Sequence, residues 1–326
     1  MHAIEVHQLR KCYGEFTAVR DIDFAVAPAE TFGFLGPNGA GKSTTISMLC
    51  TLVRPTAGTA LVHGFDVVTH HAEVRRRIGL VFQDVTLDEY LTAMENLRLH
   101  AELYGLPRQM VTERAREVLE LIGLWDRRDA LVRTFSGGMK RRLEIARGLL
   151  HSPRVLFLDE PTIGLDPQTR AHIWSYINEL KRREQVTIFL TTHHMEEAEH
   201  CDRIAIIDHG EVVIIDSPAA LKASVGKDRV LLRTDHDAEA AARLRDLWGI
   251  EARQLGEGLS FQVTLGEEFL PKLFNDLAVP IRSVSVARPT LDDVFMSYTG
   301  RTIRESEMSD GSERKGRRWR RSRIKK

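Results

Sequence analysis

An α/β fold is predicted for most of this 326-residue chain from two observations. Short apolar runs that suit buried strands alternate with segments whose apolar residues recur at helical spacing. A glycine-rich turn at residues 31–45 joins one of these strands to one of these helices. After residue 228 the order of elements changes to strand, helix, two strands, helix, strand, which predicts a small α+β domain with a ferredoxin-like sandwich.

The glycine-rich turn organises the first domain. It follows a strand that contains Phe32 and Phe34, and it has the G-x4-G-K-S pattern of a phosphate-binding loop. Its residues, called the phosphate loop below, are Gly36, Pro37, Asn38, Gly39, Ala40, Gly41, Lys42, Ser43 and Thr44. The glycines let successive amides point at an anion, Lys42 adds a charge for the β- and γ-phosphates, and Ser43 offers a hydroxyl to Mg²⁺. The turn therefore predicts a site for a nucleoside triphosphate at the positive end of a helix.

Two adjacent carboxylates, Asp159 and Glu160, follow a buried strand at residues 155–158. Successive strand residues point to opposite sides, so these two side chains cannot share one role. If this strand lies beside the phosphate loop, Asp159 is expected to face the Mg²⁺ shell and Glu160 the attacking water.

Polar residues at the ends of other elements are further candidates. Tyr13 lies on a tight turn, where it could stack on a purine or be an ordinary loop tyrosine. Ser136, followed by Gly137 and Gly138, begins a helix and predicts a second anion-binding helix terminus. Asp166 caps the helix that starts at the next proline. After a strand at 186–192, one of His193 and His194 could meet a γ-phosphate, and the other is expected on the surface.

The remaining segments complete two domains and a tail. An antiparallel β subdomain is expected from strands at 4–9 and 24–26, on either side of a loop at 11–16. Residues 87–150 have mainly helical spacing and predict a helical insertion, and residues 203–216 predict a hairpin. The predicted domains are 1–225 and 228–300, followed by a basic, disordered tail at 301–326.

Composition limits the partners and the cellular compartment expected for this chain. The chain has 46 basic and 46 acidic residues, so no net charge selects a partner, although the stretch 314–326 holds nine basic residues and no acidic one. This tail is either a solvated segment or a contact for anionic lipid. Three scattered cysteines form no disulfide framework and favour a reducing cytoplasm. No stretch is long and apolar enough to span a bilayer or to act as a signal peptide, so we expect a chain without its own membrane span.

Seven motifs together resemble those of the ATP-binding cassette (ABC) family. They are Tyr13, the phosphate loop, Gln83, FSGGM at 135–139, LFLDEP at 156–161, GLDP at 164–167 and Thr192-His193. Their order and spacing resemble those of an ABC transporter ATPase subunit over residues 4–221. Met139 and the helical block at 91–107 look like those of drug-exporter ATPases of the daunorubicin-resistance type, and residues 288–300 resemble the C-terminal end of the same proteins.

The resemblance implies a role for each motif. Tyr13 would stack on adenine, and the phosphate loop would bind the phosphates of ATP. Ser43, Gln83 and Asp159 would hold Mg²⁺, Glu160 would be the general base, and His193 would contact the γ-phosphate. Ser136, Gly137, Gly138 and Asp166 would act on the nucleotide held by the opposite subunit.

The implied protein is the ATPase of an exporter that acts on the cytoplasmic side of the membrane with a separate permease. Since one chain carries one phosphate loop and one SGG segment, it would pair with a second copy around two ATP molecules. Two alternatives remain: an ABC importer ATPase, and a soluble ABC ATPase that acts on nucleic acid. The second usually has two cassettes or long heptad arms, which this sequence lacks, so no nucleic acid partner is expected. The C-terminal domain could serve regulation, dimer support or contact with the permease, and the sequence does not identify the transported substrate.

Overall fold

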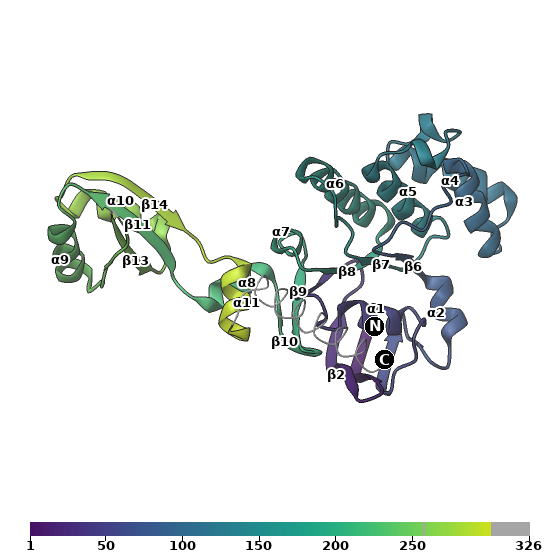
Figure 1. Ribbon diagram of the computed structural model, residues 1–326, viewed down its shortest axis with the longest axis horizontal. Helices are drawn as coiled ribbons and strands as arrows, with labels where there is room; N and C mark the ends of the chain where they lie inside the picture. The colour runs from purple at the N-terminus through teal and green to yellow at the C-terminus, as the bar shows by residue number, and fades with distance from the viewer. Residues whose placement is uncertain (257, 301–326) are drawn as a thin grey trace, which may run out of the picture. The chain divides into compact units, whose positions relative to one another are not determined.

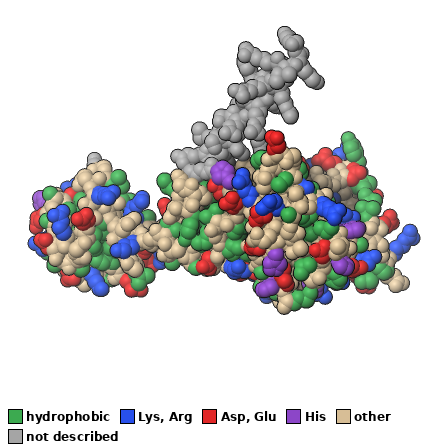
Figure 2. Space-filling model, turned by 90° about the horizontal axis from the view of Figure 1, so that it is seen from below, with side chains coloured by type: hydrophobic (Ala, Val, Ile, Leu, Met, Phe, Trp, Pro, Cys, Tyr) green, Lys and Arg blue, Asp and Glu red, His purple; other side chains and the backbone are tan. Residues whose placement is uncertain are grey.

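The computed structural model describes residues 1–256 and 258–300. Contacts divide this part of the chain into two units, one from Met1 to Asp216 and one that begins at Ser217. Figure 2 shows acidic and basic side chains interspersed over both units on the face in view. The predicted tail and its lipid contact lie outside the described residues and stay predictions.

The first unit contains a six-stranded sheet and a four-stranded sheet. Its strands are β1 (Ile4–Tyr13), β2 (Phe16–Val26), β3 (Thr31–Leu35), β4 (Ala57–Val62), β5 (Phe65–Asp66), β6 (Ile78–Val81), β7 (Val155–Asp159), β8 (Thr187–Thr192), β9 (Arg203–Asp208) and β10 (Glu211–Asp216). Its helices are α1 (Lys42–Leu49), α2 (His71–Arg77), α3 (Ala93–Leu103), α4 (Arg108–Leu121), α5 (Gly137–Leu149), α6 (Pro167–Glu184) and α7 (Met195–Ala198), with short 3₁₀ turns at Trp125–Arg127 and Val132–Thr134. The predicted α/β fold with a helical insertion is confirmed.

The six-stranded sheet has the order β10-β9-β3-β8-β7-β6, and its strands are parallel except for β10, which pairs antiparallel with β9. Figure 1 shows α1 on one side of this sheet and α3 to α6 on the other. Because β3, β7 and β8 run in the same direction, their carboxyl ends meet at one edge, which is where parallel sheets bind ligands.

Phenylalanine side chains hold the centre of this sheet against its neighbours. Phe32 and Phe34 of β3 are fully buried, and both pack against Phe24 of β2 and Phe189 of β8. The ring centroids lie 5.1–5.8 Å apart, which is the range of favourable aromatic pairs. The strand that leads into the phosphate loop is therefore packed against β2 of the antiparallel sheet and against β8.

The antiparallel sheet differs in detail from its prediction. It has the order β2-β1-β4-β5, and β1 and β2 continue through the segment expected as a loop, so that Tyr13 pairs with Phe16. Strands β4 and β5 and helix α2 were not predicted. They are short, and much of β4 is exposed, so their apolar residues show little periodicity.

The second unit contains a helix pair and a four-stranded antiparallel sheet. Its elements are α8 (Pro218–Val225), β11 (Asp228–Thr234), α9 (Asp237–Trp248), β12 (Arg253–Gln254), β13 (Leu259–Val263), α10 (Gly266–Asp276), β14 (Ile281–Ala287) and α11 (Leu291–Thr299). The sheet order β12-β13-β11-β14 confirms the ferredoxin-like sandwich. Helix α8 packs against α11, so the contacts place α8 in this unit rather than in the predicted domain 1–225.

A partly buried histidine on α3 predicts acid sensitivity of the first unit. Burial, together with the charge of Arg147 and the neighbouring His151, lowers the pKa of His100 to about 4. His100 therefore stays neutral when folded but is protonated below pH 6.5 when unfolded, so stability is lost as the pH falls from about 6.5 to about 4. The loss is at most about 3 kcal/mol. Urea denaturation of His100→Gln should show a weaker dependence on pH than the parent protein.

The matched control for this measurement is His71→Gln, because His71 is exposed on α2. It should leave the pH dependence of unfolding as in the parent. Equal slopes for the parent and His100→Gln between pH 7 and pH 5 would contradict the prediction.

Candidate nucleotide-binding site

The phosphate loop lies between β3 and α1, and its backbone requires glycine. Gly39 and Gly41 have φ angles of 85° and 104°, in the left-handed region that residues with a side chain rarely adopt. A Cβ atom on Gly36 would lie 2.2 Å from the carbonyl oxygen of Ile207, which leaves no room for any other residue. Strand β9 therefore packs directly against the loop at Gly36, and the loop amides stay available to an anion.

Lys42 begins α1 and is almost fully buried, with 4% of its surface exposed. Its Nζ atom donates hydrogen bonds to the carbonyl oxygens of Gly36 (2.7 Å) and Pro37 (3.1 Å) and lies 3.5 Å from Oε1 of Glu160. The lysine thus places a positive charge inside the loop, close to the carboxylate at the end of β7.

Asp159 contacts the phosphate loop although β7 and β3 are not neighbours. Strand β8 lies between them in the sheet, but the end of β7 still lies at the phosphate loop, as expected. Ser43 Oγ nevertheless donates a hydrogen bond to Asp159 Oδ1 at 3.1 Å, and Thr191 of β8 donates to the same oxygen. The hydroxyl of Ser43 and a carboxylate oxygen are therefore adjacent, as a Mg²⁺ site requires.

Glu160 follows β7 in a left-handed conformation, with φ 45°, and its amide donates to the carbonyl and hydroxyl oxygens of Thr191. His193 Nδ1 lies 3.2 Å from its Oε1. Burial acts to raise the pKa of Glu160, but the hydrogen bond with His193 and the charge of Lys42 outweigh it, and the pKa lies below its usual value. The carboxylate is therefore ionised at neutral pH, as a proton acceptor must be.

The two histidines after β8 lie together. The rings of His193 and His194 are 4.0 Å apart between centroids, and His194 is partly buried. The second histidine, which was expected on the surface, is therefore only partly exposed. Burial and the neighbouring His193 lower the pKa of His194.

Other predicted residues lie outside this cluster. Tyr13 is half exposed at the β1–β2 turn, with Lys11 Nζ 4.9 Å from its ring centroid. Gln83 follows β6 and is exposed, and its side chain makes no hydrogen bond or ion pair within residues 1–256 and 258–300. Neither residue is held in place by the rest of the site.

The SGG segment lies at the start of α5, apart from the phosphate loop in the order of elements. Ser136 is the N-terminal cap of α5, and its Oγ accepts a hydrogen bond from the amide of Met139. Figure 1 shows α5 on the opposite side of the six-stranded sheet from α1. Gly137 is exposed, and Gly138 packs closely on Thr169 of α6, whose amide and hydroxyl bind Asp166. The starts of α5 and α6, with Ser136 and Asp166, thus lie near one another.

Sequence reasoning missed Arg141, which is central to the structure of the site. It is buried in α5 and donates to backbone carbonyl oxygens next to the candidate catalytic residues, including those of Asp159 and Pro161. Burial lowers the pKa of Arg141, and the paired Glu144 opposes this effect. In the sequence Arg141 is one of three adjacent basic residues, and nothing in that run marks it as the buried one.

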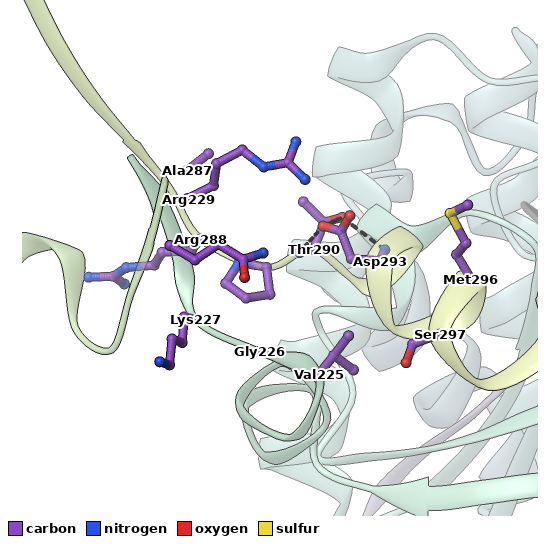
Figure 3. Close-up of a pocket in the computed structure, with 12 residues that line it drawn as sticks. Val225, Gly226, Lys227, Arg229, Ala287, Arg288, Thr290, Asp293, Met296 and Ser297 are labelled. Carbon is purple, nitrogen blue, oxygen red and sulfur yellow. Dashed lines mark hydrogen bonds between the residues drawn. The ribbon is translucent and has the colours of Figure 1, made fainter. Parts of the chain in front are cut away.

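The second unit contains a separate hollow of about 350 Å³ that holds none of the predicted site residues. Figure 3 shows Arg229 reaching toward Asp293, whose carboxylate caps α11 together with Thr290. Backbone and side-chain hydrogen bonds from Thr290 lower the pKa of Asp293, as does the charge of Arg229. These contacts show that Thr290 and Asp293 serve as a helix cap.

The residues at the edge of the sheet fit a nucleoside triphosphate with Mg²⁺. The glycine-bounded loop and Lys42 suit the phosphates, while Ser43 and Asp159 offer the few oxygen ligands that Mg²⁺ takes from a protein when phosphates and water supply the others. The part of the chain that the structure describes has no group of three or more His, Cys, Asp or Glu side chains that could hold a metal ion. The α/β fold and the phosphate loop together define a protein of the P-loop nucleotide-binding class.

Comparisons with known proteins identify the family. Residues 19–163 match the model of the ABC transporter family, and residues 217–299 match the C-terminal domain of DrrA1-3-like ATP-binding proteins. The chain is 38% identical to the linearmycin resistance ATP-binding protein LnrL of Bacillus subtilis, over 93% of this chain and 100% of that protein. It is 39% identical to the daunorubicin/doxorubicin resistance ATP-binding protein DrrA of Streptomyces peucetius, over 95% of this chain and 96% of that protein.

A solved structure is similar as well. A dimeric ATP-binding cassette in a post-hydrolysis state with ADP and Pi has a TM-score of 0.59 and 28% identity, and the match covers 66% of this chain and 98% of that one. The chain therefore belongs to the ABC transporter ATP-binding family, and it is an ATPase. The predicted resemblance is confirmed. None of the helices in residues 1–256 and 258–300 is both long and apolar enough to cross a membrane.

Proposed function

We propose that this chain is the ATP-hydrolysing subunit of an exporter that removes a drug or another amphipathic compound through a separate permease. The observation that carries the proposal is the similarity, over nearly the whole chain, to ATP-binding proteins of linearmycin and daunorubicin/doxorubicin resistance. The match of residues 217–299 to a domain of DrrA-like proteins favours this branch over an importer. In this function the subunit works on the cytoplasmic side of the membrane.

Hydrolysis is assigned to the residues at the edge of the six-stranded sheet. Lys42 binds the β- and γ-phosphates, and Ser43 and Asp159 bind Mg²⁺, with Gln83 reaching the ion from the end of β6. Glu160 accepts a proton from the attacking water, because its carboxylate is ionised and lies 3.5 Å from Lys42. His193, hydrogen-bonded to Glu160, contacts the γ-phosphate, and Tyr13 stacks on adenine.

Each complete site takes residues from two chains. Ser136 and Asp166 cap α5 and α6, which lie on the opposite side of the sheet from α1, so we propose that they act on the nucleotide of a second copy. The similar dimeric cassette with ADP and Pi supports this arrangement. Two identical subunits would then enclose two ATP molecules, and hydrolysis would reopen the dimer and move the permease.

Co-purification tests the exporter proposal. The chain is expressed with the membrane protein encoded beside it, and the ATPase rate of the purified complex is measured with anthracyclines and with polar solutes. The proposal expects a stable complex with a permease of about six spans whose ATPase rate rises with the amphipathic compounds. A neighbouring solute-binding protein that alone stimulates the ATPase rate would favour an importer, and stimulation by nucleic acid without a permease would favour the soluble alternative.

A further inference from the structure

Arg141 forms an unusually complete set of hydrogen bonds inside α5. Its side chain is 5% exposed, and all five of its N–H groups have an acceptor. Nε donates to Pro161 O (2.6 Å), Nη1 donates to Phe82 O and to Glu144 Oε2 (3.1 Å), and Nη2 donates to Asp159 O (3.1 Å) and Glu160 O (3.3 Å). One guanidinium thus binds three successive carbonyl groups after β7 and one at the end of β6.

The three successive carbonyl groups belong to the turn that carries Glu160. This residue has φ 45°, a strained conformation for a residue with a side chain, and such a conformation persists only where the surroundings fix it. On one side Thr191 accepts the amide of Glu160, and on the other side Arg141 binds the carbonyl oxygen. The direction of the Glu160 carboxylate therefore depends on both contacts.

The same helix also holds the segment 82–86, which includes Gln83. Glu144 is fully buried and accepts from the amide (2.7 Å) and the hydroxyl (3.1 Å) of Thr86. Arg147 donates to the carbonyl oxygen of Thr86 at 3.0 Å. Helix α5, which begins at Ser136, is thus bonded to both ends of this segment and to the turn after β7.

We infer that Arg141 is a positioning residue for ATP hydrolysis: it fixes the backbone from which Glu160 projects and links that backbone to the segment 82–86. The inference rests on the proposed role of Glu160 as proton acceptor. Lysine cannot replace arginine here, because an ammonium group has three donors and lacks the planar fork that reaches four carbonyl groups at once. Nucleotide binding does not depend on Arg141, since none of its bonds involves the phosphate loop.

The test compares Arg141→Lys with Arg142→Lys. Arg142 is the next residue of the helix, and it donates to Ile122 O and Tyr176 Oη rather than to the turn after β7. Arg141→Lys keeps a positive charge beside Glu144, yet it should lower kcat by about 10- to 100-fold, because small displacements of a catalytic group have effects of this size. KM for ATP should stay within about threefold, and the number of ATP molecules bound per chain should be unchanged. Arg142→Lys should hydrolyse ATP at close to the parent rate.

Two results would overturn the inference. One is a parent-like kcat in Arg141→Lys, and the other is a fall in kcat matched by an equal fall in ATP bound per chain, which indicates a general loss of structure. If Arg141→Lys does not fold, the double variant Arg141→Met/Glu144→Met, which replaces the buried pair with apolar groups of similar size, is measured in the same way. Glu160→Gln is assayed alongside: hydrolysis at the parent rate in that variant contradicts the proposed role of Glu160, independently of the result for Arg141.

Discussion

Replacing Glu160 with glutamine will abolish most ATP hydrolysis and leave ATP binding intact. Glutamine keeps the size of the side chain and one acceptor oxygen but cannot accept the proton of the attacking water. A general base contributes about 10²- to 10⁴-fold to a rate, so kcat should fall by a factor in this range. Because the phosphate loop and Lys42 are unchanged, ATP should bind as before and hold two chains together, which light scattering will detect as a lasting dimer.

Glu196→Gln is the matched control for Glu160→Gln. Glu196 lies in the same part of the fold, but its side chain is 82% exposed and pairs with Arg170 on the surface. Its replacement should change neither the rate nor the lifetime of the dimer. A Glu160→Gln variant that hydrolyses ATP at the parent rate, or that stays monomeric with ATP, would contradict the proposed mechanism.

Two inactive variants should restore activity when they are mixed. Lys42→Ala removes the charge in the phosphate loop, and Ser136→Arg blocks the SGG segment, so each homodimer has two defective sites. In a mixed dimer, the intact loop of one chain meets the intact Ser136 of the other, and one working site forms. Random mixing should therefore recover up to about a quarter of the parent ATPase rate, since half of the dimers are mixed and each has one complete site of two.

A mixture without ATPase activity would contradict this prediction. If Ser136 acted on the nucleotide of its own chain, no combination of these two variants would contain a complete site, and the mixture would stay inactive. The double variant Lys42→Ala/Ser136→Arg, mixed with an equal amount of Lys42→Ala, serves as the control. It should recover nothing under either arrangement.

The sequence predicts the phosphate loop, the carboxylates after β7 and the ferredoxin-like sandwich because each has a strong local signal. The glycines, lysine and serine of residues 36–43 have a fixed spacing that the backbone geometry of a phosphate loop sets. Residues 155–158 form an apolar run that predicts a buried strand. After residue 228 the spacing of apolar residues changes clearly between strands and helices. The predicted order of strand, helix, two strands, helix and strand is the observed order from β11 to β14. These features depend on neighbouring residues in the chain.

Features that depend on distant residues were not predictable in the same way. Arg141 belongs to a run of three basic residues, and nothing in that run shows which one is buried against the turn after β7. The placement of β8 between β3 and β7 follows from sheet order, which a strand pattern does not determine. The partial burial of His194 likewise depends on how the folded chain surrounds it, which the sequence does not determine.

Because α8 packs against α11, the second unit could be inserted into a chain or removed from it as a whole. These helices are its first and last elements, they lie side by side (Figure 1), and a hydrogen bond of 3.2 Å joins Ser224 Oγ to Tyr298 Oη. The unit therefore closes on itself next to the point where the chain enters it, as in domains that are gained or lost whole during evolution. A gene could acquire or shed this segment after Asp216 without altering the order of any strand in the nucleotide-binding sheet.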